Sequence, residues 1–132
     1  VDERIVERLR TEYAPERLAR WPLRPEVDLI ARGADGLRLA SATLMAECQD
    51  RFAAAGFTVA ATKTNHLHEA SLAHAHARRH PERTRCLELR RDLLAREFTP
   101  FAEMAIDGEK VERAAAALAS AARATLAALD PA

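Results

Sequence analysis

The chain has 132 residues, of which 48% are hydrophobic and 30% charged, a composition that indicates one globular domain and excludes a disordered protein. Its 20 Lys and Arg residues balance 20 Asp and Glu residues, so the zero formal net charge provides no general attraction to nucleic acid or to an anionic membrane. No apolar run approaches the roughly 20 residues of a membrane-spanning helix, and the first residues lack a signal-peptide layout, so we expect a cytoplasmic protein without a membrane partner.

Apolar residues recur at helical spacing along most of the chain, and β-branched residues gather only between Thr58 and Thr64. Prolines and glycines divide this pattern into segments, because proline suits the first turn of a helix and glycine commonly ends one. The pattern predicts an all-α fold, a single helical domain over residues 1–132 built as a bundle of about five to seven helices with Ala-rich packing. The predicted helices span 2–13, 25–31, 35–55, 59–79, 81–98, 99–105 and 108–129, with a short turn over 15–21.

The clearest core helix is predicted between residues 35 and 55. Its apolar residues are three or four positions apart, which places them on one helix face before Gly56 ends the helix. These residues are Leu37, Ala40, Leu44, Cys48, Phe52 and Ala55. Because Cys48 and Cys86 are far apart and both fall in helical patterns, we expect two packed thiols rather than a disulfide or a catalytic nucleophile.

All 5 histidines fall between residues 66 and 80. His76 and His80 are four residues apart, a spacing that brings imidazoles on adjacent helical turns toward one divalent ion. His66 and Glu69 form a second pair, about 10 Å further along the axis of the predicted helix and too distant to share that ion. The sequence thus predicts metal ligands among His76, His80, His66 and Glu69, with a divalent transition metal or haem as the candidate cofactor.

A metal at His76 and His80 needs ligands from another helix, and the sequence does not choose between the available side chains. These are Glu47, Asp50, Cys86 and Glu103. Two other interpretations of the histidines stay open, and the first of them, a solvated polar face, is the one that we favour. They can form a solvated polar face, or a surface that gains charge on mild acidification because imidazoles with a pKa of about 6.5 titrate together.

Six arginines form the one local basic patch of the sequence: Arg78, Arg79, Arg83, Arg85, Arg90 and Arg91. Arginine forks match carboxylate and phosphate oxygens, so such a patch can hold an anionic substrate. A solvated helix face with ordinary ion pairs is the alternative that we favour. We expect no nucleic-acid partner, because the net charge is zero and no aromatic residue is interleaved in the patch.

The last predicted helix, 108–129, carries a heptad-like seam with alternating spacings of four and three. Its members are Val111, Ala115, Leu118, Ala122, Thr125 and Leu129. We favour a seam that is one wall of the domain's own bundle. The alternative is a homodimer surface over residues 108–129, since small side chains permit close helix approach.

No catalytic elbow, phosphate-binding loop or family motif is evident in the sequence. The leading hypothesis is a non-enzymatic helical binding or regulatory module for a small molecule, a metal or a protein partner. Its ligand would occupy a cavity lined by Leu44, Phe52, Leu67, Phe98, Phe101 and Met104. The rival hypothesis is a small helical enzyme, dependent on a metal at the His66–His80 segment or on arginines that bind an anionic substrate.

Overall fold

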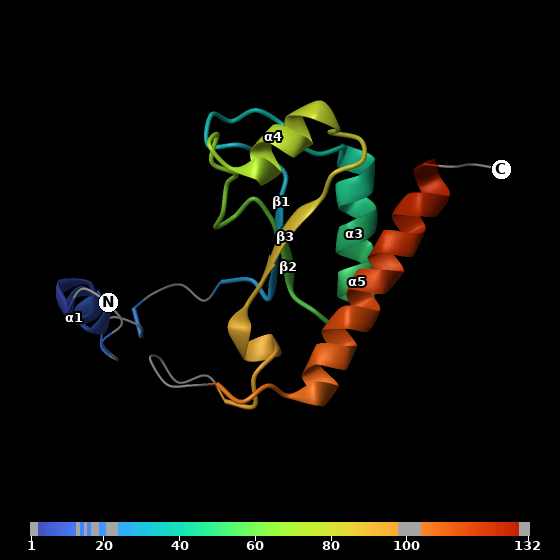
Figure 1. Cartoon of the computed structure of the whole chain (residues 1–132). Coiled ribbons are helices and arrows are strands. Elements are labelled where there is room, and N and C mark those ends of the chain that lie inside the picture. The colour runs from blue at the N-terminus through green and yellow to red at the C-terminus, as the bar shows by residue number, and fades with distance from the viewer. Residues whose placement is uncertain are drawn as a thin grey trace.

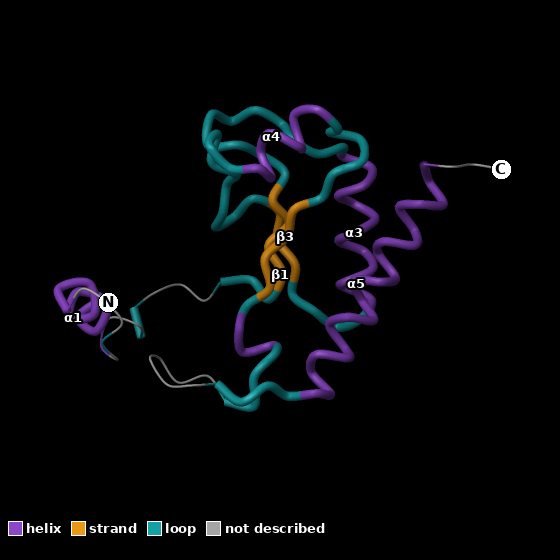
Figure 2. The backbone as a smooth tube through the Cα atoms, in the orientation of Figure 1, coloured by secondary structure: helices purple, strands orange, loops and turns teal. Residues whose placement is uncertain are grey.

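The computed structural model describes residues 3–12, 14, 16, 19–20, 24–97 and 104–129. These residues form helices packed on a three-stranded mixed sheet (Figure 1, Figure 2). The elements in chain order are α1 (Glu3–Glu12), β1 (Val27–Ile30), α3 (Ala42–Ala54), β2 (Val59–Ala61), α4 (Leu72–Arg79), β3 (Cys86–Leu89), the short 3-10 helix η1 (Arg91–Leu93) and α5 (Gly108–Leu129).

The prediction of an all-α bundle of five to seven helices is wrong, because three of the predicted helices contain strands. Segment 25–31 holds β1, segment 59–79 holds β2 followed by a loop and only then α4, and segment 81–98 holds β3 and η1. These strands are three or four residues long, too short to show the alternation that distinguishes a strand from a buried helical turn. These segments form strands because they pair with one another in the sheet. The spacing of apolar residues along the sequence carries no information about that pairing.

The predicted segments 2–13 and 108–129 form helices over nearly the expected ranges, whereas the predicted core helix 35–55 forms only over its second part, so Leu37 and Ala40 lie outside it. Helix α1 occupies most of 2–13, α5 occupies the predicted segment 108–129, and α3 begins at Ala42 instead of residue 35. Ser41 precedes α3 with extended backbone angles and marks its start. The predicted turn 15–21 and helix 99–105 fall largely outside the described residues.

Strand β1 is the centre of the sheet, and all four of its residues are buried. It pairs in parallel with β2, so α3 is the crossover between them, and it pairs in antiparallel with β3. The strand order is therefore β2-β1-β3. Because side chains alternate along a strand, Val27 and Leu29 face one side of the sheet while Asp28 and Ile30 face the other.

Helices α3 and α5 lie together on one side of the sheet (Figure 1). The core between them and the sheet includes Val27, Leu29 and Phe52. Among the described side chains of α5, those that are buried in this core are all alanines: Ala114, Ala117 and Ala121. The packed face of α5 is thus about one residue away from the predicted seam, whose Leu118 is 45% exposed.

Arg113 fastens α5 to the end of α3. Its guanidinium donates to the carbonyl oxygens of Ala55 and Gly56, each at 3.0 Å from Nη2, and lies 4.4 Å from the centre of the Phe57 ring. Gly56 has a φ of 80°, a left-handed conformation that glycine adopts without a steric cost and that ends α3. Two elements far apart in sequence are therefore fixed at one point.

The opposite side of the sheet carries a smaller core of Ile30, Leu39, Leu67 and Ala77, against which Cys86 packs. Strand β1 supplies Ile30, the segment between β1 and α3 supplies Leu39, and α4 with the loop before it supplies Ala77 and Leu67. No described helix has both the length and the apolar character needed to cross a membrane.

Candidate functional site

Asp28 is the buried carboxylate of the sheet, with a residue exposure of 3%. Its oxygens accept backbone N–H groups from Lys63, Thr64 and Asn65 at 3.2, 2.9 and 3.0 Å. Thr62 opens this turn with a φ of 50°, a conformation that a β-branched residue keeps only where its surroundings hold it. With three N–H groups bound, the Asp28 carboxylate holds the turn in place and offers little capacity for a ligand.

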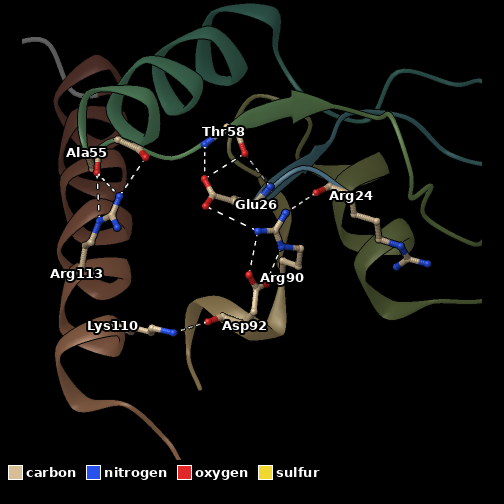
Figure 3. A network of polar contacts seen from close by, with 9 residues as sticks. Arg24, Glu26, Ala55, Thr58, Arg90, Asp92, Lys110 and Arg113 are labelled. Atoms are coloured by element: carbon tan, nitrogen blue, oxygen red, sulfur yellow. Dashed lines mark hydrogen bonds and ion pairs between the residues drawn. The ribbon is translucent and has the colours of Figure 1, made fainter. Parts of the chain in front are cut away.

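A second polar cluster connects one end of the sheet to α5 (Figure 3). Glu26 accepts hydrogen bonds from the backbone N–H and the hydroxyl of Thr58 at 2.6 and 3.1 Å, which joins β1 to the start of β2. Arg90 donates to both carboxylate oxygens of Asp92 at 2.6 and 2.9 Å, and Lys110 donates to the Asp92 carbonyl oxygen at 3.1 Å. The hydrogen bond to Asp92 raises the pKa of Arg90, and the same bond lowers the pKa of Asp92. Because these charges have partners, we assign the cluster a structural role.

Arg85, directly before β3, differs from these groups because most of its donors are unused. Its Nη1 donates to the carbonyl oxygen of Ala121 on α5 at 3.0 Å. Its Nε and Nη2 are shielded from solvent, and among the described residues neither has a hydrogen-bond partner. A guanidinium is always charged and has five N–H donors, so leaving buried donors unpaired costs free energy. Arg85 therefore has unused capacity to bind an anion.

Arg85 lines a pocket of about 680 Å³ between α3, β3 and α5. The two helices diverge toward the C-terminal half of α5 (Figure 1). The walls are mostly apolar, and a second arginine joins Arg85 there. The other lining residues are Cys48, Arg83, Leu87, Leu118, Ala121, Ala122, Thr125 and Leu126. Three members of the predicted seam of α5, Leu118, Ala122 and Thr125, thus line the pocket.

Cys48 of α3 is the thiol beside Arg85. Burial raises the pKa of Cys48, whereas the positive charge and the polar N–H groups of neighbouring Arg85 lower it by less, so the net shift is upward. The thiol is therefore protonated at neutral pH and supplies no negative charge to Arg85. Cys86 is half-buried, and burial raises its pKa too. Both cysteines are free thiols.

The structure brings together only two of the four predicted metal ligands. His76 and His80 lie at the end of α4, both exposed, with ring centroids 5.0 Å apart. His66 and Glu69 are exposed in the loop between β2 and α4, where the sequence predicted a helix. Over the described ranges, no three His, Cys, Asp or Glu side chains are grouped so that they could hold a metal ion.

The remaining predicted ligands do not extend the histidine pair. Glu47, Asp50 and Cys86 belong to no such group among the described residues, and Glu103 lies outside them. None of the described residues lining the pocket is a histidine. His74 is instead the buried imidazole, with an exposure of 3%.

The structure separates the residues of the predicted arginine patch, and it also separates those of the predicted cavity, because strands occupy segments that were predicted to be helices. Arg85 and Arg90 lie at opposite ends of β3, and Arg90 is paired with Asp92. Phe52 and Leu67 belong to separate cores on the two sides of the sheet, so they do not line one cavity. The predicted cavity residues Phe98 and Phe101 lie outside the described residues.

Comparisons of the chain with protein-family models, with curated proteins and with solved structures found no match. Function is therefore inferred from the chemistry of this chain's own residues. Sequence reasoning had included Arg85 only as one of six arginines, because the side on which it lies depends on strand β3. The pocket combines apolar walls with a guanidinium whose Nε and Nη2 have no partner among the described residues, an arrangement chemically suited to an anion that carries an apolar body.

Proposed function

We propose that this chain is a non-enzymatic binding module for a small carboxylate with an apolar body, held at the pocket between α3, β3 and α5. The observation that carries the proposal is the Arg85 guanidinium, whose Nε and Nη2 have no partner among the described residues. A ligand that supplies an anionic oxygen would remove the cost of these unpaired donors, which gives binding a specific driving force.

A carboxylate is the headgroup that fits Arg85 best. The Nε and one Nη atom of a guanidinium form a planar fork that matches two carboxylate oxygens. Here Nη1 is occupied by Ala121, so the Nε and Nη2 edge is the free one. Arg83 lines the same pocket and adds a second positive charge that attracts an anion.

The walls favour a hydrocarbon or aromatic body over a sugar or a polar metabolite. Leu87, Leu118 and Leu126 line the pocket, and its volume of about 680 Å³ lies within the roughly 300–1,000 Å³ typical of small-molecule sites. Leu126 is 67% exposed, so its side chain can move without breaking a packed core. Because Arg85 Nε and Nη2 are shielded from water, we infer that the ligand reaches them by displacing such a wall residue.

The experiment compares octanoate with octan-1-ol by isothermal titration calorimetry at pH 7. The two molecules share an eight-carbon body, so their difference in affinity reports the charged headgroup. A hydrogen bond to a charged group contributes about 1.5–3 kcal/mol, so we expect octanoate to bind at least tenfold more tightly. Arg85→Met should abolish this preference while leaving weak binding of both molecules.

The matched control is Arg79→Met, because Arg79 is exposed on α4 and does not line the pocket. It removes the same charge from the chain and should leave octanoate affinity within about twofold of wild type. Equal binding of octanoate and octan-1-ol by the wild-type chain would contradict the proposal. So would an equal loss of octanoate affinity in the two variants, which would indicate a general effect of net charge.

A further inference from the structure

Away from the pocket, the last turn of α4 carries two exposed imidazoles in contact with each other. The ring centroids of His76 and His80 are 5.0 Å apart and their planes are inclined by 51°. Both residues are exposed, and within the described part of the chain neither ring has a hydrogen-bond or ion-pair partner. Their nitrogens are therefore available to a ligand from solution.

We propose that His76 and His80 form a two-histidine chelate for a divalent transition-metal ion, with water completing its coordination. A metal–nitrogen bond of about 2.1 Å places an imidazole centroid about 3.2 Å from the ion. Two centroids 5.0 Å apart then subtend about 100° at the ion, between the roughly 90° of octahedral and 109° of tetrahedral coordination. The observed separation of the ring centroids is thus the one that two imidazoles bound to a shared ion require.

The backbone of α4 supports this pairing. Ser71 caps the helix by accepting a hydrogen bond from the backbone N–H of His74 at 3.1 Å, and buried Ala77 fixes which face is turned to the protein. The backbone N–H of His80 donates to the carbonyl oxygen of His76 at 3.0 Å, so His80 remains within helical reach although it ends the helix. The two imidazoles are consequently held on one side of the last turn.

The class of metal follows from the donor set. Neutral imidazole nitrogens suit Ni²⁺, Cu²⁺ and Zn²⁺, whereas Mg²⁺ and Ca²⁺ prefer oxygen ligands. With only two protein ligands among the described residues, the site is an open one in exchange with solvent, unlike a structural zinc site with four. Affinity should follow the general order in which Ni²⁺ binds more tightly than Co²⁺.

The test is isothermal titration of the whole chain with NiCl₂ and with MgCl₂ at pH 7.5. We expect one Ni²⁺ per chain, no heat from Mg²⁺, and a loss of Ni²⁺ affinity of at least tenfold in both His76→Ala and His80→Ala. His66→Ala is the matched control, because His66 is also exposed and lies outside the pair; it should change the affinity less than twofold. Circular dichroism of each variant checks that it is folded.

A second measurement keeps the proposal falsifiable if one variant folds poorly. Ni²⁺ should raise the melting temperature of wild type and of His66→Ala, because an ion that binds only the folded state stabilises that state. The melting temperature of His76→Ala should not change on addition of Ni²⁺. No Ni²⁺ heat up to millimolar concentration, or an equal loss in His66→Ala and His76→Ala, would overturn the proposal. Neither outcome bears on octanoate binding at Arg85, so the two sites are tested independently.

Discussion

Each side of the sheet shields atoms of a charged side chain from solvent, and the two sides treat these atoms in opposite ways. On the loop-covered side, the Asp28 carboxylate accepts three backbone N–H groups from the turn after β2. On the helix-covered side, Arg85 donates to one carbonyl oxygen, and its Nε and Nη2 have no partner among the described residues. Shielding from solvent therefore does not by itself show whether the protein satisfies a charged group.

What distinguishes the two groups is whether the protein satisfies the charge by itself. A saturated charge stabilises the fold, and its removal leaves other groups unpaired. An unsatisfied charge beside an open pocket costs stability and has capacity for a ligand. This contrast predicts opposite effects of substitution on stability and on binding at Asp28 and Arg85.

The largest expected effect is that of Asp28→Ala. The substitution leaves the buried N–H groups of the turn without their acceptor and releases the left-handed conformation at Thr62. We expect the free energy of unfolding, measured by urea denaturation, to fall by about 3 kcal/mol or more. A loss below about 1 kcal/mol would show that the carboxylate does not hold the turn.

Arg85→Met should have little effect on the free energy of unfolding and a large effect on octanoate binding. Methionine keeps much of the apolar volume and removes the unpaired donors, so we expect the free energy of unfolding to stay within about 1 kcal/mol of wild type or to rise. Urea denaturation of this variant, beside the octanoate titration, tests the contrast directly. A loss above about 2 kcal/mol would show that Arg85 stabilises the fold, as we expect of Asp28, and would contradict the contrast between the two residues.

Asp92→Asn tests the polar cluster of Figure 3 and should have the smallest effect. Because the Asp92 side chain is 41% exposed, solvent screens its pair with Arg90, and we expect a loss of only about 0.5 kcal/mol at pH 7. The hydrogen bond from Arg90 lowers the pKa of Asp92 in the folded chain. Its contribution is therefore present above the unfolded pKa, which is about 3.9, and is lost as the pH falls through the lower folded value.

The check is urea denaturation of wild type and Asp92→Asn at pH 7 and at pH 3. The difference between the two proteins should narrow at pH 3, because the wild-type carboxylate is then becoming protonated. A difference that grows on acidification would have the wrong sign for a lowered pKa, and would show that the Arg90 pair is not its source.

Sequence reasoning succeeded where a periodic pattern was long. Helix α5 extends over 22 residues, enough for the 3.6-residue period to define both of its ends. It failed at β1, β2 and β3, because three or four apolar or mixed residues are compatible with a strand or a helical turn. Because these three segments are strands, the fold is a sheet with packed helices and not the predicted bundle.

The residues of the candidate sites differ in the same way, because the arrangement of some depends on neighbours in the sequence and that of others on distant segments. The spacing of His76 and His80 is local, and the short helix α4 is enough to bring their rings together. The isolation of Arg85 is not local, because it depends on α5 packing beside β3 more than 30 residues later, at Ala121. The sequence identifies Arg85 only as one of six clustered arginines. The packed fold is needed to show that Arg85 differs from Arg90, which is paired.

Binding of a carboxylate at the free edge of Arg85 can be followed through the Nε–H group of this residue. In a ¹H–¹⁵N spectrum, the Arg85 Nε–H signal can be assigned by its absence from Arg85→Met. We predict that this signal shifts on addition of octanoate and does not shift on addition of octan-1-ol, since only the carboxylate accepts the N–H. An Arg85 signal unchanged by saturating octanoate would contradict the account.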